Sequence, residues 1–250
     1  MANLIAFAID YFRNLQKKYG KGKDRKTEIR PFDTIEATKV VVRNLKLYVN
    51  REEGFVGTSL KKDEYVADCS DIDDIIVFTA DGKMIITKVT EKSYIGKNIV
   101  HVGVFKKNDT RTVYNLVYRN GNDKISYIKR FTVTGIIRDK EYDVVEPHKD
   151  SQVLYFSANP NGEAEVISVI LRQAGSVKKL KWDINFADIL IKGRSSRGNI
   201  VTKYAIKRIE LKEKGVSTLK PRKIWYDPIV HRLNTEGRGE LLGSFKGEDR

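Results

Sequence analysis

The chain has 250 residues, of which 47 are Lys or Arg and 33 are Asp or Glu, and its formal net charge is +14. This length is sufficient for one large domain or two small ones with a buried core. A hydrophobic content of 40% with 32% charged residues excludes a membrane protein and a wholly disordered chain. No apolar run approaches the roughly 18 residues of a membrane helix. The apolar segment 2–9 ends at Asp10 and has no preceding basic region or cleavage pattern, so no secretory signal is predicted.

The cysteine count and the net charge indicate a cellular location and a class of partner. Cys69 is the only cysteine and cannot form an intramolecular disulfide, which favours a reducing, cytoplasmic environment. The excess of positive charge indicates a polyanion as partner, with nucleic acid before an anionic membrane.

The positive charge is unevenly distributed along the chain. Residues 1–30 carry a net +5 and residues 31–150 only +1, whereas residues 151–250 carry +8. Within the last part, residues 171–223 hold 15 basic and 4 acidic residues. Like charges at this density repel one another unless a counter-charged partner compensates. We therefore expect the binding surface in the later part of the chain.

One helix is predicted, at the start of the chain. Apolar residues recur at helical spacing from Leu4 to Tyr19, and Gly20 is a typical stop signal. We assign residues 1–20 to this helix and residues 21–36, which are polar and basic, to a linker. The linker lacks the GxxxxGK[ST] spacing of a phosphate-binding P-loop.

From residue 37 to residue 250 the pattern is that of strands separated by turns. A β-rich run, a tight turn and a second, often basic run recur six times at a mean step of about 39 residues. Three of the turns contain Asp-Gly or Asn-Gly pairs that favour hairpins, at residues 81–82, 120–121 and 161–162. Six such units predict an all-β, propeller-like disc, in which each small sheet packs on its neighbours. An irregular β-sandwich with coincidental spacing is the alternative.

These segments resemble the C-terminal domain of the A subunit of bacterial type II topoisomerases. The resemblance rests on the segments 19–29, 74–83, 123–131 and 195–203 taken in order, with the linker preceding the apolar strands and turn glycines of the repeats. It implies a six-bladed β-pinwheel that bends DNA around a basic outer rim. It also implies that residues 1–20 are the end of the helix leading from the catalytic core.

The resemblance favours topoisomerase IV over gyrase. Gyrases of this family carry a glycine- and arginine-rich box after the first hairpin, and the corresponding stretch here, residues 54–62, has no arginine. The implied partners are double-stranded DNA and, through parts of the protein outside this chain, a topoisomerase B (ATPase) subunit and a second A subunit. The implied location is the bacterial cytoplasm, at the nucleoid.

No catalytic, metal or cofactor site is predicted. In this family an Arg-Tyr pair carries the cleavage tyrosine, and the chain contains no such pair. The parent protein would be an ATP-dependent topoisomerase, but we expect this part to be non-catalytic. The acidic group at Asp68, Asp71, Asp73 and Asp74 lacks the glycine and terminal glutamate of an EF-hand, so a solvated turn is expected. The three histidines are far apart and have no cysteine partners for zinc.

DNA binding is therefore expected to depend on phosphate contacts, which require no particular base sequence. We expect the rim to consist of basic residues in and around the hairpins and connectors. They are Lys83, Lys88, Lys124, Lys129, Arg130, Lys178, Lys179, Lys181, Arg194, Arg197, Lys203, Lys207, Arg208, Arg222 and Lys223. The alternative function is a propeller scaffold whose basic face binds an acidic protein or RNA.

Overall fold

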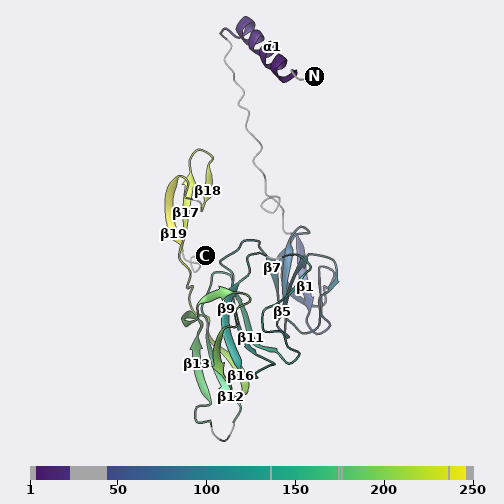
Figure 1. Cartoon of the computed structure of the whole chain (residues 1–250), viewed down its shortest axis with the longest axis vertical. Coiled ribbons are helices and arrows are strands. Elements are labelled where there is room, and N and C mark those ends of the chain that lie inside the picture. The colour runs from purple at the N-terminus through teal and green to yellow at the C-terminus, as the bar shows by residue number, and fades with distance from the viewer. Residues whose placement is uncertain are drawn as a thin grey trace. The chain divides into compact units, whose positions relative to one another are not determined.

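The computed structural model describes residues 4–22, 44–135, 137–173, 175, 177–235 and 237–245. The chain divides into two compact units, Met1–Val41 and Val42–Arg250. The first contains the helix α1 (Leu4–Tyr19), and the second contains the strands (Figure 1).

Helix α1 confirms the predicted helix. Lys17 and Lys18 lie in its last turn, where positive charge complements the helix dipole, and the amide of Gly20 donates to the carbonyl of Gln16 at 2.8 Å. None of the helical residues is buried, so its apolar face is solvent-exposed in the described structure. Most of the predicted linker and the start of the first repeat, residues 23–43, lie outside the described residues.

The described strands form five sheets. The first has the order β3-β1-β2-β6, with β1 (Leu45–Asn50), β2 (Phe55–Gly57), β3 (Glu64–Cys69) and β6 (Ser93–Tyr94). The second has the order β10-β5-β4-β7, with β4 (Asp74–Thr79), β5 (Lys83–Lys88), β7 (Ile99–Phe105) and β10 (Glu141–Asp143). The third has the order β11-β8-β9-β14, with β15 also paired to β9; these strands are β8 (Val113–Arg119), β9 (Ser126–Thr132), β11 (Gln152–Asn159), β14 (Ile191–Gly193) and β15 (Asn199–Thr202).

Two three-stranded sheets follow. The fourth sheet has the order β13-β12-β16, with β12 (Val166–Leu171), β13 (Lys181–Asn185) and β16 (Ile206–Glu213), and the short helix η1 (Phe186–Asp188) follows β13. The fifth has the order β18-β17-β19, with β17 (Arg222–Asp227), β18 (Arg232–Asn234) and β19 (Glu240–Phe245).

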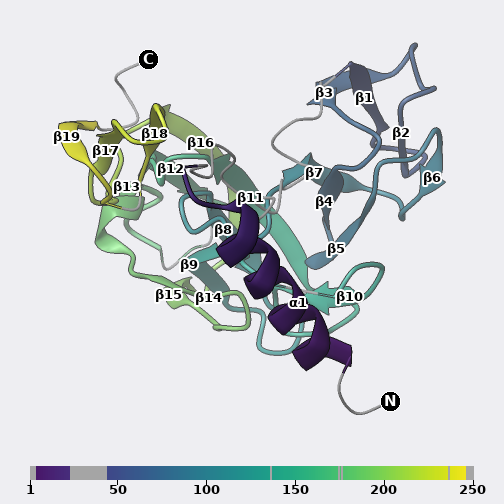
Figure 2. The same cartoon turned by 90° about the horizontal axis from the view of Figure 1, so that it is seen from above.

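The cores lie between successive sheets. On β4, Ile75 and Val77 pack into a core with the first sheet, whereas Ile76 and Phe78 pack into a core with the third. Because the second sheet is covered on both faces, these four consecutive residues are all buried, and the centre of the strand is continuously apolar instead of alternating. Figure 2 shows these neighbouring sheets from above.

The third sheet is covered in the same way. Leu116 and Tyr118 of β8 face the second sheet, and Val117, between them, packs against Ile167 and Val169 of the fourth sheet. The fifth sheet differs, because none of its described residues is buried. Four sheets therefore share three cores in chain order, and the last sheet contributes to none of them.

The six predicted repeats do not each form a separate sheet. The turn at residues 161–162 joins β11 to β12, which belong to different sheets, so it does not close a hairpin. Both strands of the fifth predicted unit, β14 and β15, pair with β9 of the third sheet. In the sixth unit the hairpin turn is 228–231, and Gly239 immediately precedes β19. The all-β class preceded by one helix is confirmed; the six-bladed count stays a prediction.

Candidate nucleic-acid interface

Two of the predicted rim residues are buried and serve the fold. The side chain of Lys129, only 2% exposed, donates to the carbonyl of Arg194 at 2.6 Å and of Ser196 at 2.9 Å, and also to that of Val144. Burial lowers the pKa of Lys129 to about 8. The prediction that Lys129 contacts phosphate is wrong, because its ammonium group already holds three backbone carbonyls inside the protein.

Arg130 is likewise buried, with 1% exposure, and its guanidinium has five acceptors. These are Asn115 Oδ1 at 3.1 Å, Thr218 Oγ1 at 3.0 Å and the carbonyls of Gly162 at 2.9 Å, Glu163 at 3.2 Å and Phe186 at 3.3 Å. Arg130 therefore joins the third sheet to three connectors, and its predicted place on the rim is also wrong. As adjacent residues of a strand, Lys129 and Arg130 point to opposite faces of β9, and both faces are covered by neighbouring sheets.

A second group of predicted residues is exposed but paired with acidic side chains. Lys124 Nζ lies 2.8 Å from Asp150, and this contact holds the pKa of Asp150 below its usual range. Arg208 lies 2.7 Å from Glu210. Arg197 contacts Asp123 and lies 3.5 Å from Glu146. These pairs reduce the net positive charge that each basic residue can offer to a phosphate.

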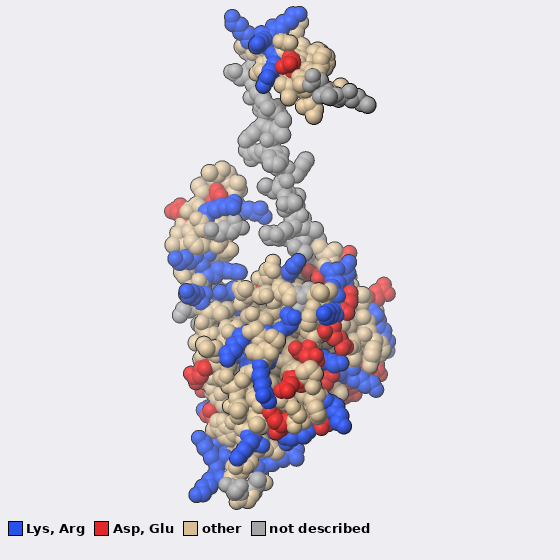
Figure 3. All heavy atoms as spheres, viewed as in Figure 1, with Lys and Arg blue, Asp and Glu red and all other residues tan. Residues whose placement is uncertain are grey.

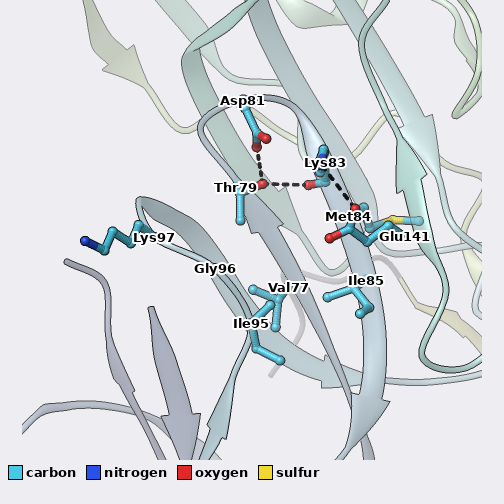
Figure 4. A pocket seen from close by; sticks show the side chains of 10 residues that line it. All are labelled: Val77, Thr79, Asp81, Lys83, Met84, Ile85, Ile95, Gly96, Lys97 and Glu141. Atoms are coloured by element: carbon cyan, nitrogen blue, oxygen red, sulfur yellow. Dashed lines mark hydrogen bonds and ion pairs between the residues drawn. The ribbon is translucent and has the colours of Figure 1, made fainter. Parts of the chain in front are cut away.

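Lys83 belongs to the same group. Figure 4 shows its ammonium group beside the carboxylate of Glu141 on β10. Lys83 Nζ lies 3.1 Å from Glu141 Oε2. The hydrogen bond that Lys83 donates to Glu141 raises the pKa of Lys83. Asp81 and Lys97 line the same depression. The β4–β5 turn therefore presents a mixed surface, which agrees with the near-neutral charge of residues 31–150.

Arg194 is half-buried against an aromatic ring. Its guanidinium carbon lies 4.3 Å from the centre of the Tyr142 ring, and Nη1 donates to the carbonyl of Gly135 at 3.4 Å. The stacking orders the β14–β15 loop but leaves part of the charge accessible.

The fourth sheet gathers most of the remaining predicted residues at one end. The amide of Leu171 donates to the carbonyl of Leu180 at 2.8 Å, and the amide of Arg172 donates to that of Ala205 at 2.9 Å. These bonds place the β12–β13 and β15–β16 turns side by side. The basic end is the set of exposed residues on and beside these turns: Arg172, Lys178, Lys179, Lys181, Lys203, Lys207 and Arg208.

The register of this sheet separates its charges along the strands. Lys181 and Arg208 both pair with Ile170, and so they lie in one row across the sheet. Asp183 and Glu210 pair with Ser168, two residues further along β12 and away from the turns. Lys212 and Ser168, with a smaller contribution from Lys181, hold the pKa of Asp183 below its usual range. The carboxylates of Asp183 and Glu210 are therefore paired with Lys212 and Arg208 on the sheet, while the turns remain basic. Figure 3 shows Lys and Arg side chains grouped at that end.

The remaining predicted pair lies in a second basic surface. Arg222 and Lys223 line a depression together with Arg111 and Lys220, and Arg111 Nη1 donates to the carbonyl of Lys220 at 3.2 Å. We call these four residues the basic connector. Arg222 also lines a neighbouring depression that includes Lys106 and Lys107.

Eight predicted residues are exposed and form no ion pair with an acidic side chain within the described part of the chain. They are Lys88, Lys178, Lys179, Lys181, Lys203, Lys207, Arg222 and Lys223. Seven of the eight belong to the basic end or the basic connector, and Lys88 lies apart from both on β5. The structure thus divides the predicted rim into buried, paired and available residues.

Sequence reasoning missed Arg111, Arg172 and Lys220. Arg172 and Lys220 lie within the charge-rich segment 171–223, so the charge count could have included them. Arg111 gave no such signal, because only the tertiary structure brings the β7–β8 turn against the β16–β17 connector.

The structure also explains the acidic group at residues 68–74. The Asp73 carboxylate accepts the amide of Ser70 at 3.0 Å, Asp68 accepts the Tyr65 hydroxyl at 3.0 Å, and Asp74 pairs with Arg138 at 2.9 Å. These contacts form an ordered turn before β4. Among the described residues, no three His, Cys, Asp or Glu side chains are grouped as metal ligands. Nor does any helix there have the length and apolar character needed to cross a bilayer.

Comparison with known proteins places the chain in a protein family. The family model described as "Topoisomerase C-terminal domain, Bacteroidota" matches residues 46–214. The A subunit of DNA topoisomerase 4 from Borreliella burgdorferi is 28% identical over 213 residues, which are 85% of this chain and 32% of that protein. The chain thus spans about a third of the length of this relative. A crystal structure of the C-terminal domain of DNA topoisomerase IV aligns with a TM-score of 0.44 and 12% identity, covering 69% of this chain and 63% of that chain.

The resemblance seen in the sequence is confirmed at the level of the family. The matched residues include the first four sheets and the basic end, whereas the fifth sheet follows the matched region. Since the match covers well over half of the chain, this protein belongs to the family of topoisomerase C-terminal domains described for Bacteroidota.

Proposed function

We propose that this chain is the non-catalytic, DNA-binding part of a type II topoisomerase A subunit, of the topoisomerase IV kind. It holds duplex DNA on the basic end and the basic connector, and thereby guides strand passage and the choice of DNA topology. The observation that carries this proposal is the gathering of basic side chains from two turns at one end of the fourth sheet, where the nearby acidic groups Asp183 and Glu210 are paired with Lys212 and Arg208.

Phosphate contact is the chemistry that this surface offers. Lysine and arginine side chains on turns reach outward and need no fixed geometry to neutralise phosphates. Each contact releases condensed counterions, so affinity falls steeply with salt and depends little on base sequence. DNA bent along such a surface is selected by its deformability, and base-specific contacts are not required.

The rest of the proposed assembly follows from the resemblance and the named relative. The parent protein would be an ATP-dependent topoisomerase, with a dimeric A subunit and a B subunit that supplies the ATPase. It would act in the bacterial cytoplasm at the nucleoid.

Charge reversal at the basic end tests the binding surface. We expect the variant with Lys178→Glu, Lys179→Glu and Lys203→Glu to bind duplexes of unrelated sequence about tenfold or more weakly at low salt, because three phosphate contacts become repulsive. Fluorescence anisotropy of labelled duplexes measures this change.

The matched control reverses Lys61, Lys62 and Lys97, which are also exposed but lie in the near-neutral residues 31–150. Its affinity should stay within about twofold of the unaltered chain. Equal losses in the two variants would show that only total charge matters. Absence of duplex binding by the unaltered chain would overturn the DNA-binding proposal, and binding of single-stranded RNA alone would favour an RNA scaffold.

A further inference from the structure

The fifth sheet ends in a turn that displays apolar side chains. Between β17 and β18, Ile229 is 88% exposed and Val230 is 60% exposed. Ile229 is the most exposed large hydrophobic residue in the described part of the chain. Two neighbouring aliphatic side chains in water at the end of a hairpin are unfavourable for solubility and fill no part of the three cores.

The turn has a defined conformation. The Asp227 carboxylate accepts the amide of Ile229 at 2.9 Å and that of Val230 at 3.4 Å. The Tyr226 hydroxyl lies 2.9 Å from Nδ1 of His231, whose backbone φ is +49°. These bonds hold the apolar pair in place on the turn, so that it is presented without a large ordering cost on binding.

The charge around the turn identifies the kind of partner. Arg232 follows the turn directly, and Arg222, Lys223 and Lys220 lie at the opposite end of β17 or just before it. Two acidic residues of the fifth sheet are described: Asp227, whose carboxylate caps the turn, and Glu240 of β19, which pairs with Tyr226. They are outnumbered by the basic residues Arg222, Lys223, Arg232 and Arg238. The hairpin is therefore a positively charged arm with an apolar end.

A polyanion with an apolar interior fits this arm. Duplex DNA has phosphates outside and stacked bases inside, and DNA-bending proteins insert Ile, Leu, Phe, Met or Pro side chains between base pairs to kink the helix. We propose that Ile229 and Val230 act as a wedge of this kind, which enters the base stack at a flexible step of DNA held on the basic connector. This inference rests on the proposed function, because the connector must first hold the duplex.

The experiment compares the full 250-residue chain with the double variant Ile229→Ser, Val230→Ser. The probe is a duplex with 2-aminopurine at several TpA steps and a fluorophore pair at its ends. The unaltered chain should raise 2-aminopurine fluorescence and shorten the end-to-end distance. In the double variant we expect the fluorescence rise to fall about fivefold or more, while affinity stays within about threefold, because the phosphate contacts remain.

The matched control is Leu190→Ser, Ile200→Ser, which removes two aliphatic side chains that are 76% and 66% exposed and lie away from the turn. It should behave like the unaltered chain. Emission of Trp225, on β17, checks that the sheet remains folded in each variant.

Several results would overturn the wedge. One is tight duplex binding by the unaltered chain without unstacking or bending, and another is a double variant that unstacks as well as the unaltered chain. Loss of binding to anionic vesicles, or a change in oligomeric state, with unchanged DNA bending would assign the turn to lipid or to a second copy. Absence of any duplex binding would overturn the proposed function together with the wedge.

Discussion

At the residue scale, two adjacent basic side chains show how burial turns a predicted phosphate contact into a structural contact. Lys129 and Arg130 lie on a strand whose two faces are covered by neighbouring sheets, and backbone carbonyls take the place of phosphate oxygens as their acceptors. A charged donor in such a site stabilises the fold only while all its acceptors are in place.

Replacement of Arg130 should destabilise the protein severely. We expect Arg130→Met to lower the free energy of unfolding by about 3–5 kcal/mol, because several buried acceptors and the nearby carboxylate of Glu165 lose their donor or counter-charge. Urea denaturation measures the loss. Lys124→Met, at an exposed ion pair, should change stability little. Equal effects of the two substitutions would contradict the structural role of Arg130.

A half-buried histidine predicts a pH dependence. His101 lies among the rings of Phe78, Tyr114 and Phe156, and burial lowers its pKa to about 4. Between about pH 6.5 and pH 4 the unfolded chain takes up a proton that the folded chain does not, so stability falls as the pH falls, by up to about 1.4 kcal/mol per pH unit.

The variant His101→Phe isolates this contribution. Its free energy of unfolding should decline less than that of the unaltered chain when the pH is lowered from about 7 to about 4. Urea denaturation across this range measures the difference between the two proteins. Parallel profiles for His101→Phe and the unaltered chain would contradict this prediction, because they would show that His101 takes up its proton equally in the folded and unfolded states.

At the element scale, turn chemistry was predictable and strand partnership was not. The Asp-Gly pair at residues 81–82 closes the β4–β5 hairpin as expected, and Gly82 has a φ of +83°. The same signal at residues 161–162 predicts a tight turn correctly but leaves open which sheet receives the next strand. Local residues set the backbone conformation of a turn, whereas pairing depends on contacts distant in sequence.

Substitution of Gly82 tests this hairpin. A Cβ at this position would lie 2.2 Å from Cγ2 of Val145, and the positive φ adds strain. We expect Gly82→Ala to lower the free energy of unfolding by about 1–3 kcal/mol. Gly193→Ala is the control, since a Cβ there meets nothing within 4 Å. A thermal or urea transition unchanged by Gly82→Ala would show that the turn and Val145 adjust without cost.

At the scale of the whole molecule, charge is concentrated in the later sheets. Residues 54–62 contain only two basic residues, Lys61 and Lys62, which lie in the β2–β3 connection. The basic end and the basic connector draw their residues mainly from 171–223. On the proposed function, DNA contacts limited to this sector would favour holding or bending of the duplex over a full wrap around the domain.

The linking number of ligated DNA circles distinguishes holding or bending from a full wrap. We expect nicked circles that are ligated with the chain bound to show little positive shift in linking number, because a short contact arc does not impose a chiral turn. The ligation products formed without protein provide the reference. A positive shift that grows with the amount of bound protein would instead indicate gyrase-like wrapping.

Local residue patterns were enough to predict the helix from Leu4 to Tyr19, the β-rich class, the turn glycines, the topoisomerase family and the charge-rich segment, because each depends on neighbouring residues or on ordered motifs. Three features needed the folded structure: the pairing of β14 and β15 with β9, the burial of Lys129 and Arg130, and the two turns that form the basic end. All three depend on contacts between sheets. Alternation along a strand tells which residues share a face, but only packing between sheets decides whether that face meets water, a core or DNA.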